Sequence, residues 1–270
     1  MIGSINPYYA PQTDGSVASK VTSTAKPSDT QSNQSTSGTQ GSSTQTISTL
    51  AQQLAASASK AEERDKTLTR SELADKAKSI LNHVVGDSYY ANKELHDSEI
   101  PNTSDPELLS RAKQAKEFVN DASRGGHSIK NPFSGLSREQ LSNIIYDESS
   151  TYTVNERHAA WRESYDQEEV WREKVAAQAM AEYNSTGKLT NFFSSVLDHF
   201  KGLPEIEQAQ YPKDYASDLQ SKIDLDFNYR THQVEGKGKE PMGLIEMLFR
   251  QSPQQTNKLP QKTNTSDNLA

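Results

Sequence analysis

Residues 147–158 gather side chains that could bind an ion or do acid–base chemistry. In a twelve-residue segment with helices predicted on either side, oxygen-bearing side chains occupy the first, third, fifth and ninth positions, as in an EF-hand calcium loop: Asp147, Ser149, Thr151 and Asn155. Two positions depart from that pattern, because Tyr152 stands where Gly makes the sharp turn and His158 replaces the bidentate Glu. With one carboxylate at a ligand position, the predicted calcium affinity is poor.

A second, shifted match to the EF-hand pattern is also incomplete. Counted from Ala61, it keeps Asp, Leu and Glu at the fifth, eighth and twelfth positions only. The simpler interpretation is that both segments connect helices and that their polar side chains cap helix ends. This interpretation places Asp147 at the end of one helix, uses Thr153 or Asn155 to cap the next and points Val154 into the core. We therefore expect no bound metal ion.

Three charged residues near the start of the predicted long helix could serve as acid, base or metal ligand: Glu148, Glu156 and His158. Paired carboxylates do acid–base chemistry when their environments separate their pKa values, and the sequence does not fix those environments. Solvated charges are the simpler interpretation, and a small hydrolase with an unrecognised site is the alternative. The chain has no HExxH, GxxxxGK[ST], GxGxxG or GxSxG motif, so no cofactor is expected.

The elements that must position these groups are predicted to be helices. A thin apolar stripe with a spacing of three to four residues begins near Ile47. The capping box Thr69–Glu72 opens a second helix, which ends at Gly86. Polar and turn residues predict a loop over 87–106, until Asp105-Pro106 opens a third helix with Asp as cap.

The central region carries the strongest helix signals. A capping box at Ser137 and Gln140 opens a short helix, and a long helix is predicted over 155–184. Two more helices are predicted, the first capped by Thr190 and the second opened by Pro212. The apolar faces of these helices predict a helical bundle. In the long helix, the side chains predicted to be buried are Trp161, Tyr165, Trp171, Val175, Ala179 and Tyr183.

Composition limits how much of the chain folds and what it binds. Hydrophobic residues make up 32% of the 270 residues, and the mean hydropathy is -0.86. A net charge of -7 gives no global positive field, so nucleic acid is not an expected partner. The absence of cysteine rules out disulfides and thiolate zinc sites. The sequence predicts neither a membrane span nor a Sec signal peptide, so we expect a soluble protein.

The N-terminal residues 1–46 differ in composition from the middle of the chain. They are mostly Ser, Thr, Gln, Gly and Pro, and their first acid is Asp14. Such a segment cannot bury enough apolar surface to offset its chain entropy, so we predict a disordered arm. The pattern resembles the export signals of type III secretion substrates, including flagellar ones. A plain disordered tail is the simpler interpretation, and an export signal is the alternative.

The C-terminal region is predicted to hold a linker, a short helix and a tail. Residues 233–240 contain Gly and Lys in alternation and predict a flexible linker. Residues 241–250 carry six apolar side chains and predict an amphipathic helix. We expect this helix to dock on the bundle or on a partner, because so many adjacent apolar groups would otherwise invite association. Residues 251–270 are polar and predict a disordered tail.

Three segments of the chain support a family resemblance: Asn131–Gln140 (NPFSGLSREQ), Tyr152–Trp161 and Phe192–Pro212. With these segments, residues 131–232 resemble a family of uncharacterised helical proteins from pseudomonads and related bacteria. The resemblance implies a bacterial origin and makes this region the defining domain. The family has no known activity, so the resemblance transfers no catalytic residue.

The sequence thus predicts a mainly α protein, a helical bundle with a disordered N-terminal arm and C-terminal tail. The predicted domains are N-terminal helices over 47–124, a loop over 125–135 and a central helical bundle over 136–232. The preferred function is a non-enzymatic bacterial protein that binds a protein partner and that a type III or flagellar apparatus could export. Its expected location is the bacterial cytoplasm, or outside it by a non-Sec route. The alternatives are a calcium-responsive or regulatory cytosolic protein with a degenerate EF-hand-like loop, and a small hydrolase.

Overall fold

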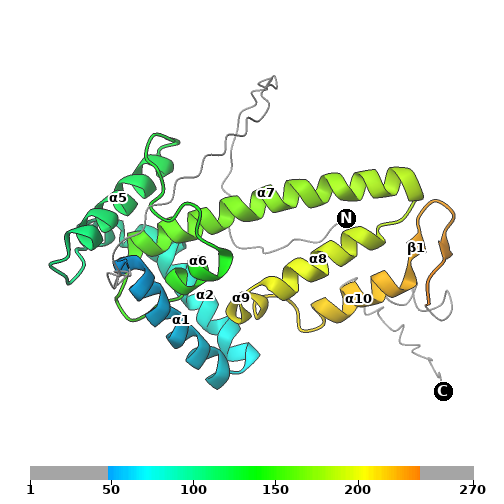
Figure 1. Cartoon of the computed structure of the whole chain (residues 1–270), viewed down its shortest axis with the longest axis horizontal. Coiled ribbons are helices and arrows are strands. Elements are labelled where there is room, and N and C mark those ends of the chain that lie inside the picture. Colours follow the sequence, from blue (N-terminus) through cyan, green and yellow to red (C-terminus); the bar gives the residue numbers. More distant parts are fainter. Residues whose placement is uncertain (1–47, 238–270) are drawn as a thin grey trace, which may run out of the picture. The chain divides into compact units, whose positions relative to one another are not determined.

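The computed structural model describes residues 48–237, and this part of the chain is mainly α-helical, as predicted (Figure 1). The predicted arm over 1–46, the helix over 241–250 and the tail over 251–270 lie outside the described residues. Among the helices that the structure describes, none combines the length and the apolar character that crossing a membrane requires.

Ten helices and one two-stranded antiparallel sheet follow one another along residues 48–237: α1 (Thr49–Thr67), α2 (Arg70–Val84), α3 (Asp87–Ala91), α4 (Lys93–Ser98), α5 (Pro106–Ser123), α6 (Arg138–Ile145), α7 (Val154–Thr186), α8 (Thr190–Gly202), α9 (Glu205–Gln208), α10 (Tyr215–Leu225), β1 (Phe227–Asn228) and β2 (Gln233–Val234).

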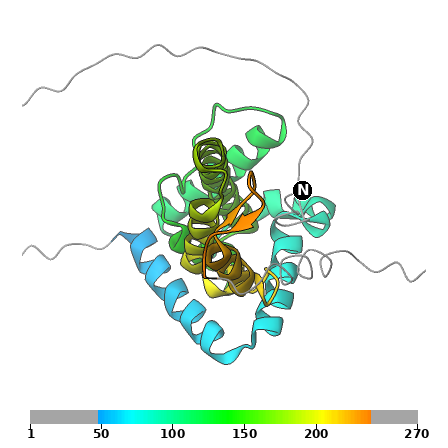
Figure 2. The same ribbon diagram turned by 90° about the vertical axis from the view of Figure 1, so that its right-hand side faces the viewer.

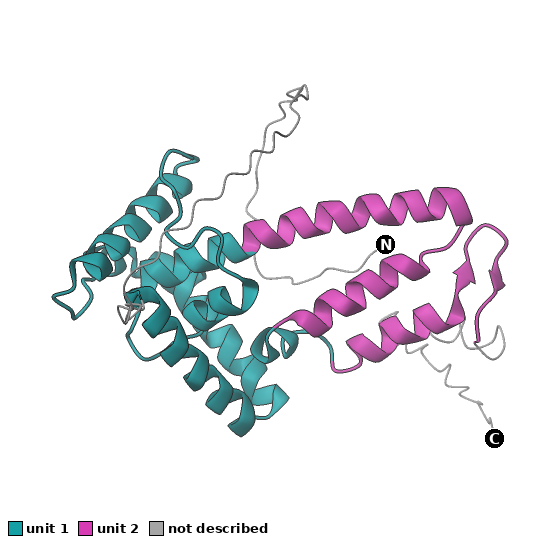
Figure 3. Ribbon diagram, in the orientation of Figure 1, with its two compact units in different colours: residues 1–164, 204–212 teal, residues 165–203, 213–270 magenta. Residues whose placement is uncertain are grey.

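These elements form two compact units (Figure 3). Unit 1 contains the described residues up to Ser164 together with Pro204–Pro212, and unit 2 contains Tyr165–Leu203 and the residues from Lys213 onward. The boundary therefore falls inside α7. This division differs from the predicted domains, because α6 packs on α1, and α9 packs on α2, which assigns both to the unit of the N-terminal helices.

Three predicted helix starts are confirmed by their hydrogen bonds. At α2, Glu72 accepts from the Thr69 N–H at 2.7 Å, while the Thr69 hydroxyl accepts from the Glu72 N–H at 3.4 Å. Ser137 and Gln140 exchange the same pair of bonds at α6. At α5, Asp105 accepts from the Glu107 N–H at 2.8 Å. Each cap satisfies a backbone donor that the helix leaves without a partner.

The prediction of a loop over 87–106 is wrong for the first half of this segment, which forms α3 and α4. Both helices are too short for an apolar period to show in the sequence, and Asn92 separates them. Tertiary burial of Tyr89 and His96 stabilises them instead. The short α9 was not predicted for the same reason. Part of the predicted linker 233–240 is also ordered, because β2 pairs with β1 with Phe227 opposite Val234.

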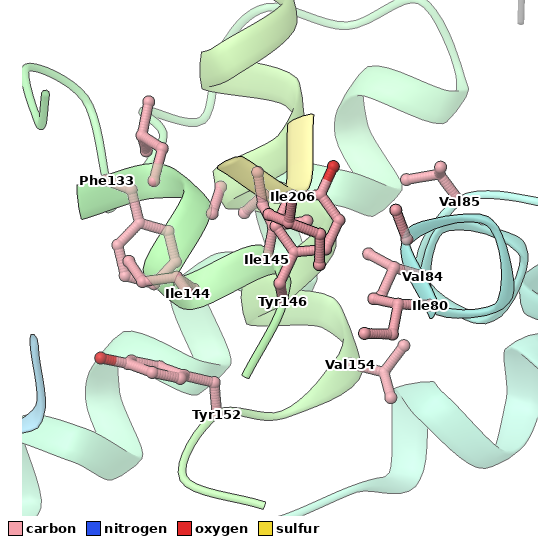
Figure 4. Close-up of a cluster of buried hydrophobic side chains, with 14 of the residues drawn as sticks. Ile80, Val84, Val85, Phe133, Ile144, Ile145, Tyr146, Tyr152, Val154 and Ile206 are labelled. Atoms are coloured by element: carbon pink, nitrogen blue, oxygen red, sulfur yellow. The ribbon is translucent and has the colours of Figure 1, made fainter. Parts of the chain in front are cut away.

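The core of unit 1 is a single cluster of apolar side chains (Figure 4). Ile80 and Val84 of α2 belong to this cluster together with Ile145 of α6 and Ile206 of α9, which lie side by side at its centre, and Ile144 of α6 lies beside Phe133. Full burial of one such side chain contributes about 1.5–3 kcal/mol. The helices α1 and α2 diverge from a short turn as an open V (Figure 2), and the apolar faces of both belong to this core.

Unit 2 has a smaller core. Its described buried apolar residues are Val175, Val196, Leu197 and Leu219, and half-buried aromatic rings surround them. Trp171 stacks on His199 with ring centroids 3.7 Å apart. The prediction that Val175 of the long helix is buried is confirmed. The prediction is wrong at Tyr183, which is 40% exposed because its ring packs under the Arg230 guanidinium rather than into the core.

The start of α8 is capped from a distance. Thr190 was predicted as the cap, and it is instead the first helical residue. The Glu182 carboxylate of α7 accepts from the N–H groups of Asn191 at 2.8 Å and Phe192 at 2.9 Å. A carboxylate there also interacts favourably with the positive end of the helix dipole. Glu182 thereby joins α7 to α8.

Candidate functional site

The loop between α6 and α7 is organised by the Asp147 carboxylate. One oxygen accepts from the Ser149 N–H at 2.6 Å and from the Ser149 hydroxyl, and the other accepts from Ser57 of α1. Burial raises the pKa of Asp147, but these hydrogen bonds outweigh it and hold the pKa below its usual value. Lys60 donates to the Ser149 hydroxyl at 2.6 Å, and Ser149 and Thr151 share a bond of 2.7 Å. The loop is therefore tied to α1 by its own polar groups.

The sharp turn of this loop is at Ser150 rather than at the sixth EF-hand position. Ser150 has φ 60°, in the left-handed region, whereas Tyr152 is not among the residues with positive φ. The Tyr152 side chain is buried, and burial raises its pKa to about 12. The backbone thus follows a different course from that of a calcium loop.

The start of α7 is a capping box formed by Thr153 and Glu156, and both side chains are buried. The Thr153 hydroxyl accepts from the Glu156 N–H at 3.2 Å, and Glu156 accepts from the Thr153 N–H at 2.8 Å. This confirms the predicted capping role of Thr153, and Val154 is buried in the core as predicted. The spacing Thr153-x-x-Glu156 is the same signal that identified α2 and α6, so it could have revealed the role of Glu156.

The fully buried Glu156 carboxylate also forms an ion pair with Arg111 of α5. The Arg111 Nε donates to Glu156 at 2.7 Å, and Arg111 Nη2 donates to Gln53 of α1 at 2.8 Å. The guanidinium lies against two aromatic rings, with centroids 5.7 Å away for Phe133 and 5.4 Å away for Tyr152. One carboxylate thus caps α7 and neutralises a cation within unit 1.

Asn155 is at the centre of a buried polar network. Its side-chain oxygen accepts from the Tyr89 hydroxyl at 2.8 Å, and its amide donates to the His96 carbonyl at 3.0 Å and to Asp97 at 3.1 Å. The Tyr89 ring stacks on His96 at 5.4 Å and meets His158 edge-on at 4.5 Å. Asn155 therefore connects α7 to α3 and α4.

His158 is a core residue held in its neutral form. Burial, followed by the charges of Arg162 and Lys93, lowers the pKa of His158 to about 3, although its ring bonds to the Val84 backbone. Burial and then the neighbouring His83 also lower the pKa of His96. Both rings pack as aromatic side chains in the interior of unit 1.

Glu148 lies apart from these groups, on the wall of a surface groove of about 500 Å³ between α1, α2 and the loop. It forms an ion pair with Lys76 of α2. Glu148, Glu156 and His158 therefore have three different environments: an exposed ion pair, a buried ion pair and an aromatic cluster. The hydrolase hypothesis requires these three side chains to share one cleft, and the structure does not bring them together.

The contacts of this loop support a specific prediction about calcium. Isothermal titration calorimetry of metal-free protein with calcium should show no binding with a dissociation constant below about 10 μM, the range of sensor sites. The reason is that Asp147 and Asn155 already accept hydrogen bonds from Ser57, Ser149 and Tyr89. A tighter constant that is lost in the Asp147→Asn variant would show that the loop opens to bind the ion.

Among residues 48–237, no group of three or more His, Asp or Glu side chains is arranged to hold a metal ion. The polar residues of the site instead connect α1, α3, α4 and α5 to the start of α7. Arg111, Tyr89 and Asp97 belong to this arrangement, and sequence reasoning did not identify them because their partners are far away in the chain.

No protein-family model matches the chain, and no curated protein or solved structure matches it. The resemblance of residues 131–232 to uncharacterised helical proteins of pseudomonads thus stays a prediction.

Proposed function

We propose that the protein is a non-enzymatic interaction protein of bacterial origin that binds a protein partner through unit 1. The observation that carries this proposal is an exposed apolar segment on α3, α4 and the residues that follow. Tyr90, Leu95 and Ile100 are 58%, 66% and 76% exposed. Single exposed apolar residues are ordinary, but three large ones within residues 90–100 are typical of a binding surface.

The backbone beneath this segment is held firmly. Tyr89 and His96, which neighbour the exposed residues in sequence, are buried and bonded or stacked within unit 1. A pre-organised surface loses less conformational entropy on binding. Tyrosine is also enriched among the residues that dominate interface energies. The exposed side chains of Asp87 and Glu94 give the segment an acidic character, so the proposed partner surface is apolar with a basic rim.

Site-specific photo-crosslinking tests this proposal. A photo-reactive amino acid at position 100 of the full chain, in cells that naturally produce the protein, should give one discrete adduct of defined mass. The matched control is position 113, where Lys113 is also exposed but lies on α5. Equal adducts at both positions, or none at position 100, would count against a binding surface at α3 and α4.

We further propose that residues 1–46 are the signal by which a type III or flagellar apparatus exports this protein. The composition of the arm supports this proposal, because it is polar and has no acid before Asp14. The apolar core that the structure describes in unit 2 is small, which is consistent with export, since a weakly stabilised unit is easier to unfold for passage through the apparatus.

A fusion of Met1–Thr46 to a reporter tests the export proposal. We expect the fusion in the medium of a strain that has the apparatus, and not in the medium of a strain that lacks it. A control fusion with residues 48–93 in place of the arm should stay inside both strains. Equal medium levels of the Met1–Thr46 fusion in the two strains would remove this part of the proposal and leave the interaction proposal standing.

A further inference from the structure

The helices α3 and α4 each contribute a single buried side chain to unit 1. Tyr89 is the buried residue of α3, and His96 is the buried residue of α4. With five and six residues, both helices are too short to be stable in water by themselves. Segments with few buried contacts open locally at a lower free energy than the core does. The attachment of α3 and α4 therefore depends strongly on these two side chains, and one of them is a histidine.

His96 lies in a cluster of aromatic rings. Its ring stacks on Tyr89 with centroids 5.4 Å apart, and His83 of α2 meets it edge-on at 5.1 Å. The Tyr89 ring also meets His158 of α7 at 4.5 Å. Three histidines, from α2, α4 and α7, thus belong to one cluster with Tyr89.

The Nε2 atom of His96 is buried, and no described residue forms a hydrogen bond with it. A protonated imidazole carries an N–H group at each nitrogen and a positive charge. A charged donor without an acceptor is costly in the interior of a protein. Water can supply the missing acceptor when α4 moves away from unit 1. Protonation of His96 and release of α4 are therefore coupled.

The charged groups around His96 favour its neutral form in the closed unit. Burial is the largest cause that lowers the pKa of His96, and His83 of α2 and Lys93 of α4 lower it further. Asp97 of α4 opposes them, but its carboxylate already accepts from Lys93 at 2.8 Å and from the neutral Asn155 amide of α7 at 3.1 Å. The pKa of Asp97 is below its ordinary value, so this carboxylate stays ionised in mildly acidic solution.

We propose that α3 and α4 detach from unit 1 in mildly acidic solution while the core of the unit stays folded. This inference rests on the proposed function, because the detached segment takes Tyr90 and Leu95 away from the firmly held surface that a partner would bind. The departure of Tyr89 also gives water access to His158, although Trp161 still packs against that ring. Acid thus withdraws the binding surface, and neutral solution restores it.

The direction of the pH effect follows from proton linkage. The pKa of His96 is lowered in the closed unit and returns toward 6.5 when α4 is released. The open form therefore binds more protons as the pH falls through this value, which favours opening. One such histidine shifts the opening equilibrium by about fivefold between pH 7.0 and 5.5.

Hydrogen exchange of the full chain, followed by mass spectrometry of its peptides, tests the proposal without a partner. Protection factors are compared at pH 7.0 and 5.5 after correction for the intrinsic exchange rate at each pH. We expect the protection of residues 87–98 to fall by about fivefold and to stay well below that of α6 at both pH values. Equal protection of the two segments at pH 5.5 would mean that unit 1 opens as a whole, and would overturn the proposal.

The His96→Phe variant identifies the titrating group. Phenylalanine keeps a ring against Tyr89 and removes both nitrogens, so the loss of protection at residues 87–98 should shrink to about twofold or less. The matched control is His127→Phe, at an exposed position in the loop after α5, and it should keep the full loss. A fivefold loss that persists in His96→Phe would assign the effect to another group and overturn the proposal.

Exchange and crosslinking give independent results. If the protection of residues 87–98 falls as expected and position 100 gives no adduct, the proposed function is wrong and the pH response stands. If the adduct forms and the protection does not change between pH 7.0 and 5.5, the pH response is wrong and the proposed function stands.

Discussion

The Glu156→Gln substitution should lower the free energy of unfolding of unit 1 by about 3–5 kcal/mol. Glutamine keeps the shape of the side chain and can still complete the capping box with Thr153. It removes the negative charge, however. The Arg111 side chain, which is only 9% exposed, is then left without an opposite charge. A cation left unpaired in the interior is strongly destabilising, and that penalty is the expected effect.

Urea denaturation followed by the fluorescence of Trp161 measures this change in unit 1. A Trp171→Phe background removes the signal of unit 2. The matched control is Glu72→Gln, because Glu72 completes the capping box of α2 in the same way and is exposed. We expect the control to unfold like the parent protein.

The double variant Arg111→Met with Glu156→Gln isolates the charge. It removes both charges and keeps the capping box, so it should recover most of the lost stability. If the double variant is as unstable as Glu156→Gln alone, the destabilisation comes from the cap or from packing and not from the buried ion pair.

Unit 1 should also lose stability steeply as the pH falls from 6.5 to 5.0. His158 is buried, and its pKa in the folded protein is about 3 against 6.5 for an ordinary histidine. Below pH 6.5 the unfolded chain therefore binds a proton that the folded protein does not, which favours unfolding. Each pH unit costs about 1.4 kcal/mol for such a group, so His158 contributes a loss of about 2 kcal/mol over this range.

The other titrating groups with shifted pKa values in unit 1 either act in the same direction as His158 or titrate outside this pH range. The lowered pKa of His96 adds a loss of the same sign. The carboxylates of Asp97 and Asp147 have pKa values below the ordinary 3.8, because hydrogen bonds outweigh their burial. Their contribution to stability is present above that value and is lost only at lower pH. Between pH 6.5 and 5.0 the buried histidines therefore dominate.

The His158→Gln variant should have a smaller loss of stability between pH 6.5 and 5.0, by about 2 kcal/mol. Glutamine still offers an N–H group for the Val84 backbone, although some stability is lost at pH 7 through altered packing. The control is His127→Gln, since His127 is exposed in the loop after α5. An unchanged pH dependence in the His158→Gln variant would mean that His158 is protonated in the folded state near pH 6.

The helix starts of this protein could be predicted because their signals are local. Thr69 with Glu72, Ser137 with Gln140, and Asp105-Pro106 each satisfy backbone donors within a few residues. The bundle architecture follows from the apolar faces of helices such as α2, α5 and α8, whereas α7 has no single apolar face along its whole length. The capping part of the loop 147–158 was predictable in the same way.

The remaining features depend on partners far apart in sequence. Glu156 looks like a solvated charge until Arg111, 45 positions earlier, is placed beside it. Glu182 caps α8 from another helix, where sequence reasoning selected the local Thr190. The helices α3 and α4 are stabilised by the buried contacts of Tyr89 and His96, which no short periodic pattern can reveal. Tertiary packing decided each of these cases.

The proposed function is that unit 1 binds a partner through its exposed apolar segment and not through the polar groups of the loop. Photo-crosslinking from position 100 tests this most directly when Leu95→Asp is compared with Glu148→Gln. Both residues are largely exposed, so both variants should fold. We predict that Leu95→Asp abolishes the adduct and that Glu148→Gln leaves it unchanged. An adduct that survives Leu95→Asp and disappears with Glu148→Gln would contradict the proposed function and assign binding to the groove beside the loop.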